Sequence, residues 1–552
     1  MVVFKAVKKP IIKTSVAGAE VSPLRPQYAV KTPPCTGTCP SGVDIRGWLI
    51  TIAQAEAYGR TNEQAFEIAW GKITERNPFP AVCGRVCPHP CEDACNRKEK
   101  EGGVAVNALE RFIGDFGIEK GLKLSRLSQE QRSEKVAVIG AGPAGLSCAY
   151  QLARRGYPVT VFEAFSKPGG MLRYGIPAYR QPRAVLDAEI QRILDLGVEL
   201  KCGCVVGKDV LLDQLRQEYR AVFTGIGAHK GLKLGVPGED APNVFTGTEF
   251  LNRVNSGEEV PVGDKVIVIG GGDTAIDAAR VSKRLGAEVT ILYRRTRAEM
   301  PAIKPEIEGA LEEGVAIEFL AAPVEVLREN GLATGLRSIR MELGEPDKSG
   351  RPRPVPKPGT EFDVSATAII AAISQEPDFG PLPELHQGKD WIKADRWGAT
   401  KMDGVFAGGD DIELGLVSIA IAQGRFAAEA IDAHLRGVPL EMPQAPPPIK
   451  TEKMKLGWYK PADRHQRPHL PVERRGMDTE IEQGLSQEDV IAEAKRCMSC
   501  GMCADCETCW MYCSNNCFVR LPKGEHYKVK LELCNGCKKC AEECPCGYID
   551  LI

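Results

Sequence analysis

One stretch, residues 135–163, constrains the fold of this 552-residue chain more than any other. It reads KVAVIGAGPAGLSCAYQLARRGYPVTVFE: a β-branched run enters a GxGxxG turn, an apolar helical pattern follows, and a second short run ends in an acid. This order is typical of a βαβ unit that binds a dinucleotide, because the glycines permit a tight turn, close approach to a pyrophosphate and close helix packing. The helix N-terminus then faces the phosphates with unpaired N–H groups. We expect the nucleotide to contact Gly140, Gly142, Pro143, Ala144, Gly145 and, through a ribose 2′-OH, Glu163.

A second βαβ pattern follows at residues 265–295. Where the first unit ends in Glu163, the second ends in Tyr293 followed by two arginines. A carboxylate at this place repels a 2′-phosphate, whereas guanidinium groups bind it in bidentate fashion. The pattern favours NADP(H), and NAD(H) remains the alternative if the arginines only form a solvated charge patch. The expected binding residues are Gly270, Gly272, Asp273, Thr274, Ala275, Arg294 and Arg295.

The distribution of the 21 cysteines predicts metal sites at both ends of the chain. Six lie between Cys35 and Cys95, twelve between Cys497 and Cys546, and three in the long stretch between. A disulfide framework is the alternative, and the size of the protein and the lack of an export signal disfavour it. We therefore expect two metal-bearing modules that flank a nucleotide-binding core.

The C-terminal cysteines carry the most specific signal, the spacing C-x2-C-x2-C-x3-C twice over. This is the spacing of bacterial ferredoxins with two [4Fe–4S] clusters, in which the fourth cysteine of each run serves the other cluster. One predicted ligand set is Cys503, Cys506, Cys509 and Cys544, and the other is Cys534, Cys537, Cys540 and Cys513. Four cysteines are left over, and they either allow a register that begins at Cys500 or act as packing thiols: Cys497, Cys500, Cys517 and Cys546.

The N-terminal cysteines lie on short loops that can wrap an iron–sulfur cube, and their spacing fits no common zinc finger. The six are Cys35, Cys39, Cys83, Cys87, Cys91 and Cys95. This module resembles the helical Fe–S domain of the glutamate synthase small subunit family, which dihydropyrimidine dehydrogenase shares. Members usually carry two more cysteines ahead of Cys35, where this chain reads RPQYAV, so six thiolates stand where two cubes need eight. The resemblance therefore implies either one lost cluster or non-cysteine ligands, with Cys39, Cys87, Cys91 and a possible fourth, Cys83, retained and the pair Cys35 and Cys95 orphaned.

Three glycine-rich segments resemble the FAD-binding set of the glutamate synthase small subunit and adrenodoxin reductase families. They contribute Gly170, Met171, Gly175 and Ile176 from the first segment, Gly227 from the second, and Gly409 and Asp410 from the third. The resemblance implies that FAD occupies the first βαβ unit and that Asp410 holds the ribityl and phosphate region. It also implies that a helix at residues 416–435 points its N-terminus at the isoalloxazine.

Together these patterns predict an α/β protein with two nested Rossmann-like domains. The expected order is an N-terminal helical Fe–S domain (1–129), an FAD domain (130–245 and 395–440), an NAD(P)H domain (246–394), a linker (441–490) and a ferredoxin-like α+β domain (491–552). Hydride passes directly from nicotinamide to flavin in such an arrangement, so we expect no catalytic side chain.

Composition excludes several classes of partner. The formal charge is only −2, which gives no sign of nucleic acid binding. No apolar run approaches the length of a membrane span, and the first residues lack a signal-peptide core. We expect a cytoplasmic protein.

The leading hypothesis is an oxidoreductase subunit that passes electrons between NAD(P)H and a partner catalytic subunit or ferredoxin through FAD and [4Fe–4S] clusters. Fused chains of this kind resemble the electron-transfer subunits of 2-oxoacid oxidoreductases such as phenylglyoxylate dehydrogenase. Two alternatives stay open: a glutamate synthase small subunit proper, which the fused ferredoxin disfavours, and a non-catalytic wiring or scaffold subunit, which the two intact fingerprints disfavour.

Overall fold

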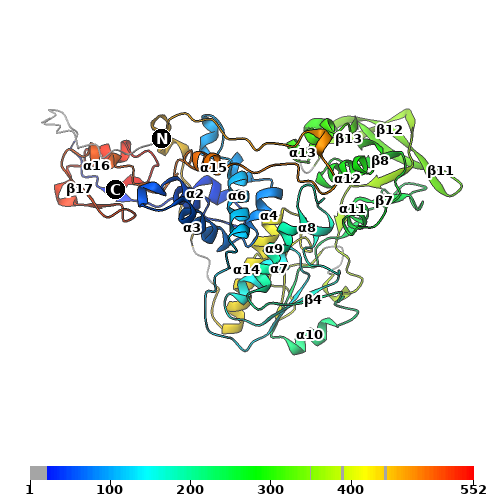
Figure 1. Cartoon of the computed structure of the whole chain (residues 1–552), viewed down its shortest axis with the longest axis horizontal. Helices are drawn as coiled ribbons and strands as arrows, with labels where there is room; N and C mark the ends of the chain where they lie inside the picture. Colours follow the sequence, from blue (N-terminus) through cyan, green and yellow to red (C-terminus); the bar gives the residue numbers. More distant parts are fainter. Residues whose placement is uncertain (1–20, 348–349, 387–390, 441–443) are drawn as a thin grey trace. The chain divides into compact units, whose positions relative to one another are not determined.

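A computed structural model describes residues 21–347, 350–386, 391–440 and 444–552 of the chain (Figure 1). The start of the expected Pro-rich linker, at 441–443, lies outside the described residues. The chain forms two compact units, each assembled from separate stretches of sequence. The central unit comprises Arg126–Pro439 and His469–Gln483, and the terminal unit comprises Met1–Ser125, Leu440–Pro468 and Gly484–Ile552.

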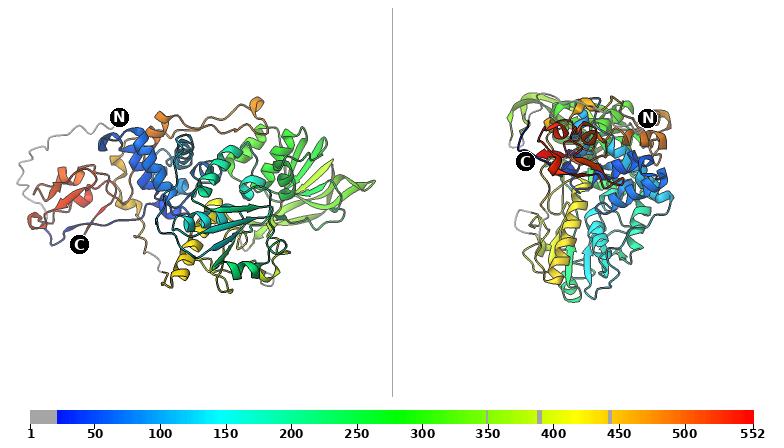
Figure 2. Two further views of the ribbon diagram at one scale, coloured as in Figure 1. Left: turned by 60° about the horizontal axis from the view of Figure 1, so that its bottom comes forward. Right: turned by 90° about the vertical axis from the view of Figure 1, so that its left-hand side faces the viewer.

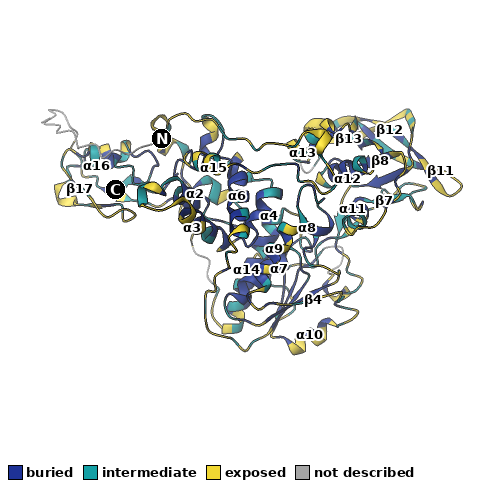
Figure 3. Ribbon diagram, in the orientation of Figure 1, coloured by how far each residue is buried: buried dark blue, intermediate teal, exposed yellow. Residues whose placement is uncertain are grey.

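The first sheet of the central unit is parallel and has the order β16-β5-β2-β3-β4. Its strands are Val405–Ala407 (β16), Ala221–Thr224 (β5), Val136–Ile139 (β2), Val159–Glu163 (β3) and Glu199–Cys202 (β4). The strands β2, β3 and β5 are buried along their whole length (Figure 3), as expected of parallel strands that helices cover on both faces. Helix α7 (Pro143–Ala153) links β2 to β3, and α14 (Val417–Arg436) lies alongside it (Figures 1 and 2).

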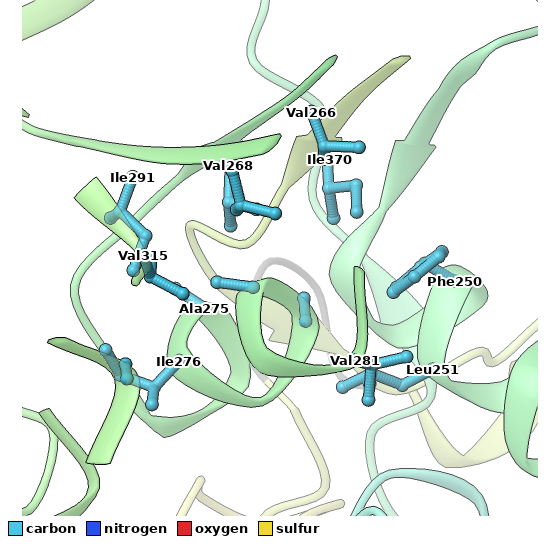
Figure 4. Close-up of a cluster of buried hydrophobic side chains, with 14 of the residues drawn as sticks. Phe250, Leu251, Val266, Val268, Ala275, Ile276, Val281, Ile291, Val315 and Ile370 are labelled. Atoms are coloured by element: carbon cyan, nitrogen blue, oxygen red, sulfur yellow. The ribbon is translucent and has the colours of Figure 1, made fainter. Parts of the chain in front are cut away.

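The second sheet repeats this plan with the order β10-β9-β8-β14-β7, again parallel. Its strands are Ala316–Phe319 (β10), Glu288–Tyr293 (β9), Lys265–Ile269 (β8), Ala368–Ala371 (β14) and Val244–Thr246 (β7). The helices α12 (Asp273–Arg284) and α11 (Gly247–Asn255) pack on it. Figure 4 shows the resulting core, in which Val268 and Ile370 of the sheet face Ala275 of α12 and Phe250 of α11.

An antiparallel three-stranded sheet covers the second parallel sheet on its other side. It consists of β11 (Ala321–Glu329), β12 (Leu332–Pro346) and β13 (Pro352–Ser365). Val326 and Leu336 of this sheet form one core with Ile267 and Leu292. The predicted α/β fold with two Rossmann-like domains is confirmed.

The N-terminal part of the terminal unit is helical. Its helices are α1 (Pro34–Thr38), α2 (Ile45–Ala53), α3 (Asn62–Thr74), α4 (Pro80–Val86), α5 (Pro90–Asp93) and α6 (Val106–Glu119). Helices α4 and α6 approach closely because Gly84 and Gly114 face the opposing backbone. A Cβ at either glycine would lie 2.2 Å from a backbone nitrogen of the other helix.

The last residues of the chain complete the terminal unit. They form α15 (Gln487–Ala494), α16 (Thr508–Tyr512), the hairpin β17 (Phe518–Arg520) and β18 (Tyr527–Val529), α17 (Lys539–Glu542) and β19 (Ile549–Leu551). Strand β19 pairs antiparallel with β1 (Pro26–Tyr28), so the two ends of the chain share one small sheet. None of the helices in the described part of the chain is both long and apolar enough to cross a membrane.

Candidate functional site

An open cavity with about 1500 Å³ of space free of protein atoms lies at the carboxyl ends of β2, β3, β5 and β16. Ligands of open α/β sheets bind at this edge. Most of the residues predicted to hold FAD line the cavity: Gly140, Gly142, Pro143, Ala144, Glu163, Gly170, Met171, Ile176, Gly227, Gly409 and Asp410. Gly145 and Gly175 are not in its wall. Gly145 instead packs helix against turn, since a Cβ there would lie 1.9 Å from the carbonyl oxygen of Gly140.

Two glycines of the cavity cannot be replaced without moving backbone. Gly140 has φ +94°, and a Cβ on it would lie 2.4 Å from the carbonyl oxygen of Gly225. Gly170 has φ +52°, and its Cβ would lie 2.8 Å from the Cα of Gly142. Two loops that are distant in sequence therefore approach each other through glycines. Because no side chains project there, a pyrophosphate can lie beside the backbone.

Glu163 ends β3 and fixes the loops on either side of it. Its Oε2 accepts a hydrogen bond from the Ala141 N–H at 2.7 Å, and its Oε1 accepts one from the Phe165 N–H at 2.8 Å. Burial raises the pKa of this carboxyl group. Each oxygen retains a lone pair, so Glu163 can still accept a hydrogen bond from a ribose hydroxyl.

Asp410 is a polar group of the cavity wall, and its buried neighbour Asp411 was not singled out in the sequence. Burial raises the pKa of Asp410 to about 6, although a hydrogen bond from the Gly415 N–H acts to lower it. Asp411 accepts hydrogen bonds from the Ile226 N–H at 3.1 Å and from the Thr224 hydroxyl at 3.3 Å. It thereby holds the turn after β5, which lines the cavity. A sequence signal existed, because the two aspartates are adjacent at the end of one strand.

His229 is a second residue of the cavity wall that sequence reasoning missed. Burial lowers its pKa to about 4, so the imidazole is neutral at pH 7. Its ring lies 5.3 Å from that of Phe165, which in turn lies 4.4 Å from that of Tyr174. No spacing motif marks this histidine, since its position depends on a fold that joins distant loops.

The second nucleotide turn begins at Gly270 and leads into α12. Asp273, the first residue of the helix, accepts a hydrogen bond from the Ile303 N–H at 3.0 Å, and the buried Ala275 packs the helix on the sheet. The two arginines after β9 differ. Arg294 is exposed, whereas the Arg295 side chain is 4% exposed, forms an ion pair with Asp347 at 2.8 Å and donates a hydrogen bond to the Pro352 carbonyl.

Three of the N-terminal cysteines, Cys39, Cys87 and Cys91, form a group with a half-buried carboxylate, that of Glu110. The pKa of Cys91 is raised by burial first and then by the charges of Glu92, Glu110, Cys39 and Cys87. Burial raises the pKa of Glu110 to about 7. Glu110 lies on α6, away from every cysteine motif, and therefore escaped the sequence analysis.

Asn77 joins Glu110 to Cys83, the cysteine predicted as a possible fourth ligand. It donates a hydrogen bond to Glu110 Oε1 at 2.9 Å and accepts one from the Cys83 thiol at 3.7 Å. An oxygen donor, Glu110, and a sulfur donor, Cys83, thus lie beside the other three cysteines.

The C-terminal cysteines of the two spacing motifs lie close enough to affect one another's pKa. Burial first raises the pKa of Cys509, and the charges of Cys506, Cys503, Cys544 and Cys540 raise it further. Burial likewise raises the pKa of Cys540, followed by the charges of Cys513, Cys537 and Cys534. The second group lines a cavity of about 370 Å³, together with Cys517.

Comparison with known proteins places this geometry in a family. Residues 134–424 match the family described as pyridine nucleotide-disulphide oxidoreductase, which covers more than half of the chain. The chain belongs to this family. Residues 25–122 match dihydropyrimidine dehydrogenase domain II, 4Fe-4S cluster. The predicted enzyme class of this pyridine nucleotide-disulphide oxidoreductase, an FAD- and Fe–S-dependent NAD(P)H oxidoreductase, is confirmed.

Several curated relatives are similar over most of their length. The subunit beta of NADPH-Fe(3+) oxidoreductase from Geobacter sulfurreducens is 38% identical over 85% of this chain and 75% of its own. The subunit beta of NADP(+)-dependent formate dehydrogenase from Moorella thermoacetica is 39% identical over 85% and 70%. The glutamate synthase [NADPH] small chain of Escherichia coli is 36% identical over 72% and 88%, which confirms the predicted resemblance.

Solved structures agree on the fold. The structure of Mycobacterium tuberculosis FprA in complex with NADPH has a TM-score of 0.50 and 17% identity, and the match covers 55% of this chain and 85% of FprA. This likeness shows that the two proteins share a fold.

Proposed function

We propose that this chain is an electron-transfer subunit that passes electrons between NADPH and a partner catalytic subunit through FAD and [4Fe–4S] clusters. The observation that carries the proposal is the combination, in one chain, of a glycine-walled cavity on a Rossmann sheet, a second Rossmann sheet and grouped cysteines. A flavin takes up a hydride and can release its two electrons singly, whereas clusters carry one electron at a time.

The residues of the cavity fit FAD. The bare backbone at Gly142 and Gly170 and the N-terminus of α7 suit a pyrophosphate, and Glu163 suits the ribose. Leu416 and Val417, at the start of α14, and Asp410 line the same cavity, where the positive end of the helix favours negative charge on a ring. The neutral His229 adds a polar group without adding a charge.

The second sheet would hold NADPH, with Gly270 and Gly272 at the pyrophosphate. The exposed Arg294 is the candidate partner of a 2′-phosphate, whereas Arg295 forms an ion pair with Asp347. Two relatives, at 38% and 39% identity, carry NADPH or NADP(+) in their names, which supports the same choice.

The partner would be the subunit that performs the substrate chemistry. The relatives from Geobacter sulfurreducens and Moorella thermoacetica are both named as beta subunits, and this chain matches 70% or more of each. All of the cysteines are described, and none forms a disulfide. Free thiols in this number suit a reducing compartment, so we place the protein in the cytoplasm.

An anaerobic titration of the purified chain with NADPH and, separately, NADH tests the proposal. Flavin bleaching and the broad Fe–S absorbance are followed together. We expect NADPH to reduce both chromophores, and at lower concentration than NADH. If neither nucleotide reduces the flavin while dithionite reduces the clusters, the proposed function is wrong and a wiring subunit takes its place.

A further inference from the structure

Four cysteines that the spacing motifs left unassigned line one cavity in the terminal unit. They are Cys35 and Cys95 from the N-terminal helices and Cys497 and Cys500 from the segment after α15. All four belong to the wall of the same small cavity, so the four sulfurs lie near one another. Two stretches about 400 residues apart in sequence therefore meet around one group of thiols.

This cavity is about as large as the one beside the second group of ferredoxin-type cysteines. It has about 380 Å³ of space free of protein atoms, against 370 Å³ for the cavity beside Cys513, Cys534, Cys537 and Cys540. Zinc bound by four thiolates at about 2.3 Å holds the sulfurs only about 4 Å apart. Among the described residues, no three of these thiol sulfurs lie within 4.8 Å of one another. The thiols are therefore more widely spaced than four ligands of one zinc ion, which favours a four-iron cube.

The segment that carries Cys497 and Cys500 is docked by buried polar contacts. Glu493 accepts a hydrogen bond from the Ala105 N–H at 2.7 Å. The Arg496 side chain is 1% exposed, forms an ion pair with Glu493 at 2.6 Å and donates to the Gly102 carbonyl at 2.7 Å. In return, Arg97 donates to the Arg496 carbonyl at 3.1 Å. Buried charges that are paired in this way fix the position of a segment, because any displacement would leave a buried charge without its partner.

The wall of the cavity is also suited to a negatively charged group. Arg46 and Arg97 both line it, and a cube held by four thiolates carries net negative charge. Arg46 donates hydrogen bonds to the Ser499 hydroxyl at 2.8 Å and to the Cys503 carbonyl at 2.6 Å. The Asn96 amide donates to the Cys500 sulfur at 3.6 Å. Such contacts orient the ligands of a cluster and adjust its reduction potential.

We propose that Cys35, Cys95, Cys497 and Cys500 together hold an additional [4Fe–4S] cluster. Its ligands come in equal parts from the N-terminal helices and from the segment that precedes the ferredoxin-type motif. The two cysteines missing ahead of Cys35 are thus replaced by a Cys-x-x-Cys pair from the other end of the chain. The earlier expectation that Cys35 and Cys95 had lost their cluster is revised accordingly.

This cluster deepens the proposed function, because its role as an electron carrier rests on that function. Cys500 would bind this cluster, and Cys503 would bind the first ferredoxin-type cluster. Three residues span at most about 11 Å, so the two clusters are neighbours on one short loop. Electrons would pass between the N-terminal and C-terminal clusters within the terminal unit.

Iron and acid-labile sulfide analysis of the anaerobically reconstituted full chain tests the inference without nicotinamide or flavin. We expect about 16 iron atoms per chain, for two ferredoxin-type clusters, the cluster of the Cys39 group and the additional one. About 12 iron atoms per chain, or zinc in place of the missing iron, would overturn the inference. A chain with about 16 irons that NADPH does not reduce would keep the cluster and refute the proposed function instead.

Two double variants locate the cluster. Cys35→Ser/Cys95→Ser and Cys497→Ser/Cys500→Ser change different segments, and we expect each to lose about four iron atoms. The control is Cys202→Ser, which removes an exposed thiol of the central unit and should keep the full content. Full iron content in both double variants would contradict the inference.

A single variant serves if the double variants fold poorly. Loss of one thiolate converts a cube to a three-iron form, so oxidised Cys497→Ala should show the paramagnetic signal of that form. Its absence from a Cys497→Ala protein that keeps its iron would count against the proposed ligand set.

Discussion

At the scale of single residues, the two adjacent arginines after β9 have different roles that the sequence motif does not distinguish. The sequence placed Arg294 and Arg295 together on a 2′-phosphate. Both residues lie in the bend that follows β9, and their side chains differ in burial. Arg295 turns inward to Asp347, while Arg294 stays exposed. The sequence predicts two arginines after the strand, but not which of them forms a buried ion pair within the fold.

We expect Arg294→Ala to raise the KM for NADPH by about 10- to 100-fold, because a hydrogen bond to a charged group contributes about 1.5–3 kcal/mol. The KM for NADH should stay unchanged. Steady-state kinetics with an artificial acceptor measures both constants. Arg295→Ala is the matched comparison and should lower the melting temperature instead, since it removes the ion pair between Arg295 and Asp347. An unchanged NADPH constant in Arg294→Ala would remove this arginine from the site.

At the scale of elements, the sequence pattern predicted the helices and strands that depend on neighbouring residues alone. The units β2-α7-β3 and β8-α12-β9 follow directly from their glycines and apolar runs. The segment His469–Gln483 was expected to be linker, yet it belongs to the central unit. It is polar and has no periodicity, and its order comes from contacts with distant residues. Arg475 forms an ion pair with Glu313 at 3.2 Å, and Ile481 is buried in the core of the second sheet.

Glu313 is the centre of a buried ionic network at this point. Arg280 and Arg284 bind it at 2.6 and 2.7 Å, and its side chain is 5% exposed. Burial acts to raise its pKa, but the hydrogen bonds from Arg280 and Arg284 outweigh burial and lower the pKa to about 2. Because the folded-state value lies below the ordinary 4.5, the stabilisation is fully present above pH 4.5 and is lost as the pH falls toward 2.

We therefore expect Glu313→Gln to lower the free energy of unfolding by about 3 kcal/mol at pH 7. The difference from the unmodified protein should be constant between pH 8 and pH 5 and shrink below about pH 4.5. Urea unfolding followed by flavin fluorescence measures it. Glu312→Gln is the control, since that side chain is 54% exposed and should cost under about 1 kcal/mol. Equal effects of the two variants would show that the network does not stabilise the fold.

At the scale of the whole molecule, each unit is discontinuous in sequence. The sequence predicted metal-bearing modules at the two ends of the chain as separate domains, because every spacing motif is local. It could not show that Glu493, Arg496 and strand β19 join the last residues to the first helices, since such contacts carry no pattern. Because such contacts carry no pattern, the sequence also could not show that Cys35 and Cys95 lie beside Cys497 and Cys500.

A chain that ends after Leu485 tests this arrangement. We expect it to keep its flavin but to hold only about four iron atoms, those of the Cys39 group, because the partners of Cys35 and Cys95 are gone. Iron analysis of the truncated protein measures the loss. About eight iron atoms would mean that the N-terminal helices bind two clusters by themselves.

The pairing of β1 with β19 also sets an order of events during synthesis. Ribosomes add about 5–20 residues per second, so Pro26–Tyr28 emerges roughly half a minute to two minutes before Ile549–Leu551. For that interval the first strand has no partner, and the thiols near it belong to a nascent chain. This small sheet can therefore form only after the segment that carries β19 has been translated.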